Sequence, residues 1–148
     1  MISVLTPVDF SDDLLKELHC LDNDYFPNPW SMDQWLNLKN SEIIYLFRGE
    51  DLKIRGFALF ELNNLESLGH LYKILTIPKF RTQKHASRLM VFAIDDLKRR
   101  KVDRIYLEVA TNNSVGVNFY ESFNFEVLTT KQKFYSNGDD AFAMQLTL

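Results

Sequence analysis

The apolar positions of the chain recur with two periods, and the order in which these periods alternate predicts the secondary structure. Short runs rich in β-branched and aromatic residues are typical of strands, and segments with an apolar residue every three to four positions are typical of helices. Strands are expected over Ile2–Val8, Ile43–Arg48, Ile54–Leu62, Leu71–Ile77, Arg104–Ala110, Glu126–Lys133 and Ala141–Leu148. Helices are expected over Leu14–Leu21, Ser31–Leu38, Lys84–Lys101 and Ser114–Phe123. The pattern predicts a mixed α/β (α+β) fold.

Local signals set several of the boundaries. Ser31 and Gln34 have the spacing of a capping box, and Gly49–Asp51 and Ser136–Asp139 separate strand-like runs as tight turns do. The three strand-like runs between residues 43 and 77 are therefore expected to be antiparallel neighbours. The 148 residues contain no repeat, low-complexity tract or linker, which predicts a single domain over residues 1–148.

Composition narrows the possible classes of function. A net charge of −3 provides no overall basic field for nucleic acid. Because the chain shows neither a basic leader nor a long apolar run, we expect a cytoplasmic protein without a membrane span. Cys20 is the only cysteine, which excludes an internal disulfide or a cysteine-based zinc site. The histidines His19, His70 and His85 show no metal-ligand spacing, so no metal is expected.

The segment Leu71–Met90 contains the clearest candidate site. An apolar run stops at a proline, passes through a basic turn and continues with helical spacing, so a strand is expected to lead into a helix N-terminus. Helix N-termini carry unpaired N–H groups and a partial positive charge, and Lys79, Arg81, Lys84 and His85 add cations around the turn. The turn either binds a phosphate or pyrophosphate or is a solvated basic turn between two ordinary elements.

Several motifs, taken in order, resemble the Gcn5-related N-acetyltransferase (GNAT) superfamily, and within it the ribosomal-protein alanine N-acetyltransferase (RimI) branch. The segments that carry the likeness are FPNPWS from Phe26, IPKFRTQKHASRLM from Ile77, YLEVATNN from Tyr106, NFYESFNF from Asn118 and DDAFAM from Asp139. The resemblance implies a GNAT fold with a mixed central sheet of about six to seven strands, about four helices and splayed central parallel strands.

The same resemblance implies an acetyl-CoA-dependent N-acetyltransferase. Its acceptor is implied to be the α-amine of a protein or peptide N-terminus, and the protein is implied to be a monomer or homodimer. Because one fold serves many acceptors, a small-molecule amine or a lysine side chain is the alternative acceptor. A non-catalytic acyl-CoA-binding module is the alternative outside enzymes.

The basic turn corresponds to the family's pyrophosphate loop, written Q/RxxGxG/A. Lys84 stands where the family has its first glycine. Glycine permits an unusual φ and a close approach of phosphate to backbone N–H groups, whereas lysine adds a Cβ but also a cation that can contact phosphate. The residues implied to bind acetyl-CoA are Ile74, Leu75, Thr76, Arg81, Thr82, Gln83, Lys84, His85, Ala86, Ser87, Asn113 and Tyr120. On the strand, a main-chain N–H is implied to polarise the thioester carbonyl.

Acetyl transfer to an amine needs a base for the amine and an acid for the departing thiolate. Glu108 is implied as the base, acting directly or through a water. From the residues alone, its carboxylate is either desolvated, with a raised pKa, or directed to solvent by strand alternation. Tyr120 is implied as the acid, because a phenol stays protonated at neutral pH and can reprotonate a thiolate. On periodicity alone, Tyr120 would instead be a core aromatic residue.

The resemblance also implies an acceptor groove, with Phe26, Trp30 and Tyr135 as substrate-binding residues. Two acidic residues lie near the first of these in the sequence, Asp22 and Asp24. They either attract a cationic N-terminus or belong to a solvated face, and the solvated face is the more usual place for acidic residues.

Overall fold

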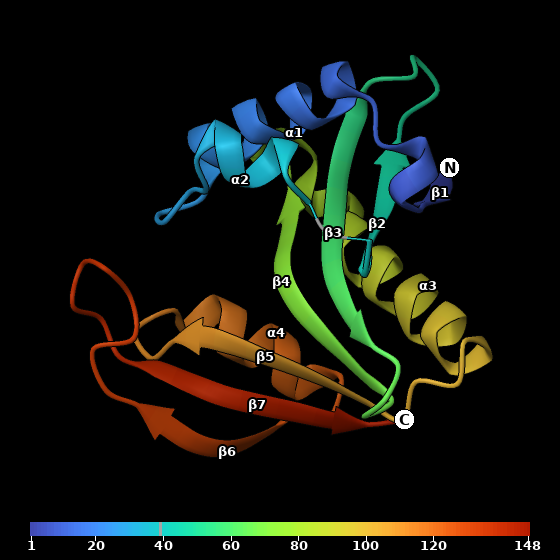
Figure 1. Ribbon diagram of the computed structural model, residues 1–148. Coiled ribbons are helices and arrows are strands. Elements are labelled where there is room, and N and C mark those ends of the chain that lie inside the picture. The colour runs from blue at the N-terminus through green and yellow to red at the C-terminus, as the bar shows by residue number, and fades with distance from the viewer. Residues whose placement is uncertain (39) are drawn as a thin grey trace.

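A seven-stranded sheet forms the centre of the molecule (Figure 1). The computed structural model describes residues 1–38 and 40–148, apart from the side chains of residues 81–83. Its strands are β1 (Ile2–Leu5), β2 (Glu42–Arg48), β3 (Ile54–Asn63), β4 (Leu68–Thr76), β5 (Arg104–Ala110), β6 (Glu126–Lys131) and β7 (Ala141–Thr147). Its α-helices are α1 (Asp12–Tyr25), α2 (Met32–Leu36), α3 (His85–Arg99) and α4 (Ser114–Ser122). Two 3-10 helices, η1 (Pro7–Asp9) and η2 (Pro78–Gln83), precede α1 and α3. Within the described residues, this is the mixed fold that the sequence predicts.

The sheet has the strand order β1-β2-β3-β4-β5-β7-β6, and β4 and β5 are its parallel neighbours. The strands β2, β3 and β4 are antiparallel to one another, as predicted. Along the described residues, the β4–β5 ladder starts at Leu68↔Arg104 and ends at Leu71↔Leu107, although β4 continues to Thr76. The two strands therefore diverge, as Figure 1 shows, and the predicted splay of the central parallel strands is confirmed.

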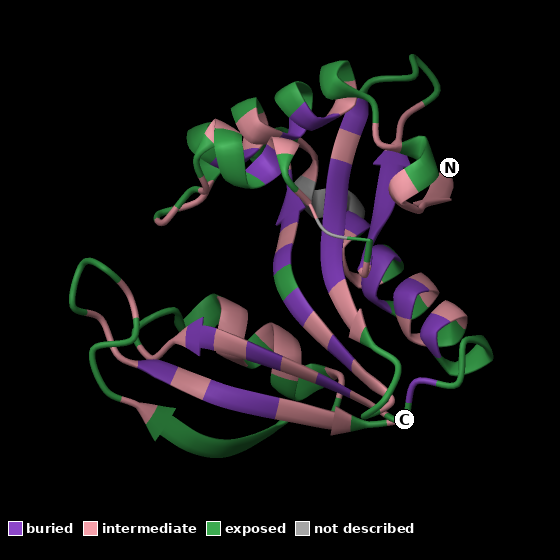
Figure 2. Ribbon diagram, viewed as in Figure 1, coloured by how far each residue is buried: buried purple, intermediate pink, exposed green. Residues whose placement is uncertain are grey.

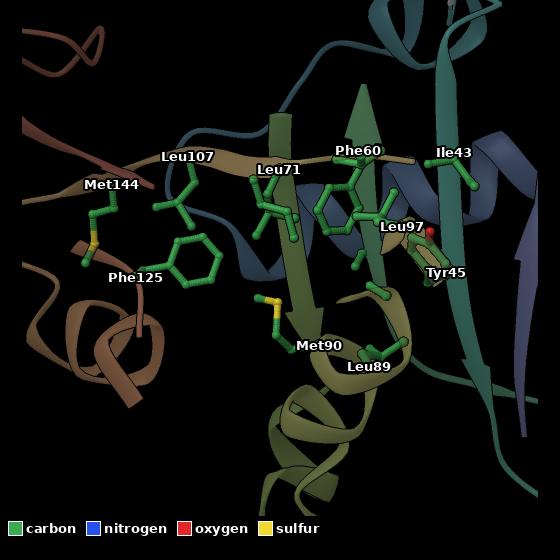
Figure 3. Packing of buried hydrophobic residues seen from close by; sticks show 14 of the residues in the cluster. Ile43, Tyr45, Phe60, Leu71, Leu89, Met90, Leu97, Leu107, Phe125 and Met144 are labelled. Atoms are coloured by element: carbon green, nitrogen blue, oxygen red, sulfur yellow. The ribbon is translucent and has the colours of Figure 1, made fainter. Parts of the chain in front are cut away.

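The two faces of the sheet bury different side chains, because successive residues of a strand point to opposite faces. Leu18 of α1 and Trp35 of α2 pack on one face. Met90 of α3 packs on the other face in a cluster that also includes Leu107 and Phe125 (Figure 3). Figure 2 shows that β2 is buried along nearly its whole length, whereas β6 at the sheet edge is largely exposed. Helices thus cover both faces of the sheet, with α1 and α2 on one face and α3 on the other.

Two element boundaries differ from the prediction in a way that has a local cause. β1 ends at Leu5 and does not reach Val8, because Pro7 fits the first turn of a helix and Thr6 and Asp9 form a capping box around η1. β4 begins before the predicted start at Leu71, because its first residues pair with β3 on one side and β5 on the other. The other predicted elements are present, with ends shifted by a few residues.

The single cysteine and the three histidines lie on separate elements. Cys20 is exposed on α1 beside His19, His70 lies on β4, and His85 begins α3. Among the described residues, no group of three or more His, Cys, Asp and Glu side chains is placed to hold a metal ion. No helix in the described part of the chain has the length and apolar character needed to cross a membrane.

Candidate active site

A cavity of about 590 Å³ opens where β4 and β5 diverge. Its walls come from both strands, from the segment between α1 and α2, from α4 and from the loop before β7. The lining residues are Phe26, Pro27, Asn28, Trp30, His70, Leu71, Tyr72, Lys73, Ile74, Glu108, Val109, Ala110, Asn113, Tyr120, Phe134 and Tyr135. Segments that are far apart in the sequence therefore meet at the gap that the splayed strands leave.

Glu108 contributes a carboxylate to this cavity from the middle of β5. Its side chain is 10% exposed, and both carboxylate oxygens are hydrogen-bonded. His70 Nε2 lies 2.7 Å from Oε1, while the Tyr106 hydroxyl donates to Oε2 at 3.0 Å and Lys131 Nζ donates to the same oxygen at 2.7 Å. Four side chains from β4, β5 and β6 thus form one polar cluster, which we call the Glu108 cluster.

The cluster keeps Glu108 ionised. Burial by itself favours the neutral acid, but the hydrogen bonds from His70, Lys131 and Tyr106 outweigh burial and lower the pKa of Glu108 from 4.5 to about 2. The expectation of either a raised pKa or a solvent-directed carboxylate is therefore wrong. Strand alternation does point Glu108 away from the apolar core. Its carboxylate is nevertheless hydrogen-bonded to three neighbouring side chains rather than directed into solvent.

Tyr120 is both a packed aromatic residue and part of the cavity wall. Its ring makes edge contacts with Phe119 and Phe125 on α4 and just beyond it, and the residue also lines the cavity. Burial, with a smaller contribution from Tyr135, raises the pKa of Tyr120 above its ordinary value. The phenol therefore carries its proton at neutral pH. The two interpretations of Tyr120 are compatible, because its packing holds the ring at the cavity.

Asn113 lines the same cavity at the N-terminus of α4. Its side chain accepts a hydrogen bond from the Gly116 N–H at 3.0 Å and so caps the helix. Asn113 therefore has a structural role as a helix cap, which the motif in the sequence does not indicate. Its position on the cavity nevertheless places it near the other predicted acetyl-CoA residues.

In the turn between β4 and α3, a lysine adopts a backbone conformation that usually favours glycine. Lys84 occupies the N-cap position of α3 with φ 57° and ψ 34°, in the left-handed region, and its side chain makes no capping hydrogen bond. The N–H groups of the first turn, from His85 to Ser87, therefore receive no cap from the N-cap residue itself. The side chains of Arg81, Thr82 and Gln83 lie outside the described residues.

His85 does not join the cations of this turn. Its side chain is buried, and its ring stacks on Phe47 with the centroids 4.3 Å apart. Burial and the nearby Arg88 and Arg55 lower its pKa, which favours the neutral ring. Of the predicted acetyl-CoA residues on β4, Ile74 lines the cavity, whereas Leu75 and Thr76 are buried. Ala86 and Ser87 lie in the first turn of α3 and are not among the residues that line the cavity.

The three predicted acceptor residues are brought together. Phe26 and Trp30, between α1 and α2, and Tyr135, before β7, all line the cavity. Lys73 of β4 lies against the first two, with Nζ 4.6 Å from the ring centroid of Phe26 and 5.1 Å from that of Trp30. We call the part of the cavity lining formed by Phe26, Trp30 and Tyr135 the aromatic wall; the Lys73 ammonium lies against two of its rings.

Asp22 is not on a solvated face, and that expectation is wrong. The residue is fully buried and accepts three hydrogen bonds, from Lys73 Nζ at 2.8 Å, from the Trp30 N–H at 2.8 Å and from Trp35 Nε1 at 2.9 Å. Asp24, two positions later, is exposed as expected. The spacing of Asp22 after Leu18 puts it on the buried face of α1, and this spacing is the signal in the sequence that identifies it.

We call Asp22, Lys73 and the two tryptophans the Asp22 cluster. It ties α1, α2, β4 and the segment between the helices to one carboxylate. Burial lowers the pKa of Lys73, and the hydrogen bond with Asp22 opposes that shift. Neither Lys73 nor the Glu108 partners His70 and Lys131 stand out in the sequence, because polar residues at such strand positions carry no motif.

Comparisons with known proteins agree with this geometry. A model of the acetyltransferase (GNAT) family matches residues 12–125. The ribosomal protein bS18-alanine N-acetyltransferase of Haemophilus ducreyi is 27% identical over 111 residues, which are 75% of this chain and 75% of the relative. The crystal structure of the ribosomal-protein-S18-alanine N-acetyltransferase from Escherichia coli superposes with a TM-score of 0.85 at 22% identity, covering 99% of this chain and 94% of that one. Arabidopsis thaliana NAA60 in complex with acetyl-CoA gives a TM-score of 0.82 at 14% identity, covering 100% and 98%. At these identities the two solved structures bear on the fold alone.

Proposed function

Because the chain belongs to the acetyltransferase (GNAT) family, we propose that the cavity between β4 and β5 brings acetyl-CoA together with the N-terminal α-amine of a protein or peptide. The chain is an N-acetyltransferase that uses acetyl-CoA. The α-amine acceptor is our proposal, and the alanine N-acetyltransferase relatives support it. The observation that carries it is an ionised carboxylate, Glu108, on the wall of a cavity lined by aromatic residues.

The residues around the cavity fit acetyl-CoA in two places. Among the described residues the β4–β5 ladder ends at Leu71, so the main-chain groups of Tyr72 to Leu75 that face β5 can receive a pantetheine arm. At the other end, the first amides of α3 are suited to a pyrophosphate. Lys84 adopts the left-handed conformation that favours glycine, so a residue other than glycine holds that backbone geometry at this position. Acetyl-CoA supplies the thioester that the amine attacks.

The acceptor amine is held by charge and by aromatic contact. An α-amine has a pKa of about 8, so at neutral pH it reaches the enzyme mainly as an ammonium ion. Glu108 attracts that cation because its lowered pKa keeps the carboxylate ionised at neutral pH. Phe26, Trp30 and Tyr135 line the cavity around the place where the first residues of a peptide would lie. Tyr120, protonated on the same cavity, supplies the proton for the departing thiolate.

A panel of amines tests the acceptor class. Purified protein is incubated with acetyl-CoA and, in separate reactions, with a peptide that starts with alanine, the same peptide with a blocked N-terminus and one free lysine, and spermidine. Free thiol is measured and products are mapped by mass spectrometry. Acetylation of the α-amine supports the proposal. Acetylation of the lysine or of spermidine alone would replace it with the alternative acceptor class, and acetyl-CoA binding without thiol release would contradict catalysis.

Tyr120→Phe tests the proposed acid. We expect kcat to fall by at least about 100-fold, the low end of the usual contribution of a general acid, while the affinity for acetyl-CoA stays nearly unchanged. Single-turnover kinetics and acetyl-CoA titration measure the two effects separately. Tyr25→Phe is the matched control, because Tyr25 is exposed at the end of α1 and does not line the cavity. Unchanged turnover in Tyr120→Phe would remove Tyr120 from the mechanism.

A further inference from the structure

The Glu108 cluster leaves the reaction without an obvious proton acceptor. The acceptor ammonium must lose a proton before its nitrogen can attack a carbonyl. The two oxygens of Glu108 already accept three hydrogen bonds, one of them from the Lys131 ammonium. These donors lower the pKa of Glu108 to about 2, roughly six units below that of an α-amine. A carboxylate this acidic attracts a cation well and removes its proton poorly.

The other titratable side chains of the cavity wall are Tyr72, Lys73, Tyr120, Tyr135 and His70. Lys73 is a buried cation paired with Asp22. Burial raises the pKa of all three tyrosines, to about 12 for Tyr72, so none of them is an anion at neutral pH. Histidine is the side chain that ordinarily gains and loses a proton near neutrality. Elimination among the lining residues therefore leads to His70.

We propose that His70 is the base that deprotonates the acceptor amine, and that Glu108 is the positioning residue that orients its ring. The inference rests on the proposed function, since it requires an amine in this cavity. With Glu108 ionised, His70 donates its Nε2–H to Oε1 across 2.7 Å, and the neutral ring then carries its lone pair on Nδ1. The side chain is 27% exposed and lines the cavity, so the ring is open to an incoming amine.

Two aromatic rings and a carboxylate surround the ring of His70. His70 packs against Tyr72 at 4.4 Å and Tyr106 at 5.1 Å between ring centroids. The charged and titratable groups that face it are Glu108 and Tyr106 on β5, Tyr72 on β4, Glu61 in register on β3, and Lys131 on β6 through Glu108. The carboxylate in direct contact stabilises the imidazolium that forms when Nδ1 takes the proton, as the acidic member of a hydrolase triad does for its histidine.

The protons balance in this scheme. The acceptor ammonium gives one proton to His70 Nδ1, which later passes it to water. The free amine forms a C–N bond at the carbonyl carbon, and the C–S bond breaks. The nitrogen gives its second proton to water as the adduct collapses, while Tyr120 donates a proton to the sulfur and recovers one from the solvent. In total, an ammonium ion and a thioester become an amide, a thiol and one released proton.

His70→Gln tests the proposal, because glutamine keeps a donor for Glu108 but removes the base. The rate is measured as kcat/KM for the alanine peptide across pH 6 to 10, together with the KM for acetyl-CoA. At pH 7 we expect a loss of at least about 100-fold with an unchanged KM for acetyl-CoA. The loss should shrink as pH rises past the amine pKa of about 8, since the amine then arrives already deprotonated. A purely structural role would give a loss that does not depend on pH.

A second variant shows whether lost activity comes from the missing base or from misfolding, and a control tests a histidine elsewhere in the chain. His70→Ala with added imidazole should regain activity in proportion to the free base form of imidazole. His19→Gln, on α1 and outside the cavity lining, should behave like the parent. The role of His70 alone would be overturned if the parent acetylates the peptide, the kcat/KM of His70→Gln runs parallel to that of the parent across the pH range, and imidazole restores no activity to His70→Ala. A folded parent that acetylates no amine would overturn the proposed function and this inference together.

Discussion

Two carboxylates lie in or next to the cavity in different surroundings: Glu108 lines it, whereas Asp22 is hydrogen-bonded to the lining residues Trp30 and Lys73. Asp22 and Glu108 each accept a hydrogen bond from a lysine, at 2.8 Å and 2.7 Å. In the Asp22 pair both side chains are sealed, with 0% and 5% of the carboxylate and the lysine exposed. In the Glu108 pair the carboxylate is 10% exposed and the lysine 40%. The same chemical pair is closed in one place and open in the other.

The two carboxylates differ in the groups that donate hydrogen bonds to them. Asp22 takes its hydrogen bonds from the backbone of Trp30, the ring of Trp35 and Lys73, so removing it would loosen the segment that carries the aromatic wall. Glu108 takes its hydrogen bonds from side chains that line or border the cavity. A sealed ion pair fixes structure, and one that borders a cavity keeps a charge within reach of substrate. Substitutions in the two clusters test this difference through their effects on stability.

The largest effect is expected from Lys73→Met. Removing one partner of a buried ion pair leaves an unpaired buried charge, which costs about 3 to 5 kcal/mol of unfolding free energy. Denaturant unfolding measures the loss. Lys131→Met is the matched control, because the lysine of a partly exposed pair contributes about 1 kcal/mol or less. Adding Asp22→Asn to Lys73→Met should restore part of the stability, since the buried charge is then gone. Equal losses in the two lysine variants would mean that the clusters do not differ as described.

A smaller effect, present near neutrality and lost in acid, is expected from Glu108→Gln. The folded-state pKa of Glu108 is lowered from 4.5 to about 2, so its ionisation stabilises the fold above pH 4.5, and this contribution is lost as pH falls toward 2. The stability advantage of the parent over Glu108→Gln is expected to reach at most about 3 kcal/mol near neutrality, at about 1.4 kcal/mol per pKa unit.

Denaturant unfolding of the parent and of Glu108→Gln between pH 2 and pH 7 measures this difference in stability. Glu17→Gln provides the control at an exposed position of α1 and should show little difference from the parent at any pH. Parent and Glu108→Gln curves that run parallel through the acid range would show that the donors around Glu108 do not favour its ionised form.

The smallest effect is expected outside both clusters, from Lys84→Gly. The left-handed backbone at φ 57° costs a lysine about 1 kcal/mol, but glycine gains a similar amount of freedom in the unfolded chain, so stability should change by less than about 1 kcal/mol. The Kd of acetyl-CoA should change by less than about tenfold, because the amides of α3 already have their geometry. Isothermal titration checks both proteins. Binding by the variant without detectable binding by the parent would show that the lysine blocks the site.

Much of the fold follows from the sequence, because periodicity and turn residues act locally. The capping box of Ser31 and Gln34 forms as predicted, and β5 has its predicted ends. The motifs around Glu108, Tyr120 and the aromatic wall identify residues that the structure brings to one cavity. Errors occur where a local pattern has two physical outcomes, as for Pro7, which can end a strand or begin a 3-10 turn.

The sequence by itself determines the order of helices and strands and the segments that carry the site, since both depend on neighbours along the chain. Only the tertiary structure decides the state of the charges. His70 and Lys73 on β4 and Lys131 on β6 are unremarkable in the sequence, and each meets a carboxylate of another element, across 23 to 51 positions. A pKa depends on the donors and the dielectric that surround a group in space, and neither is fixed until the strands have paired.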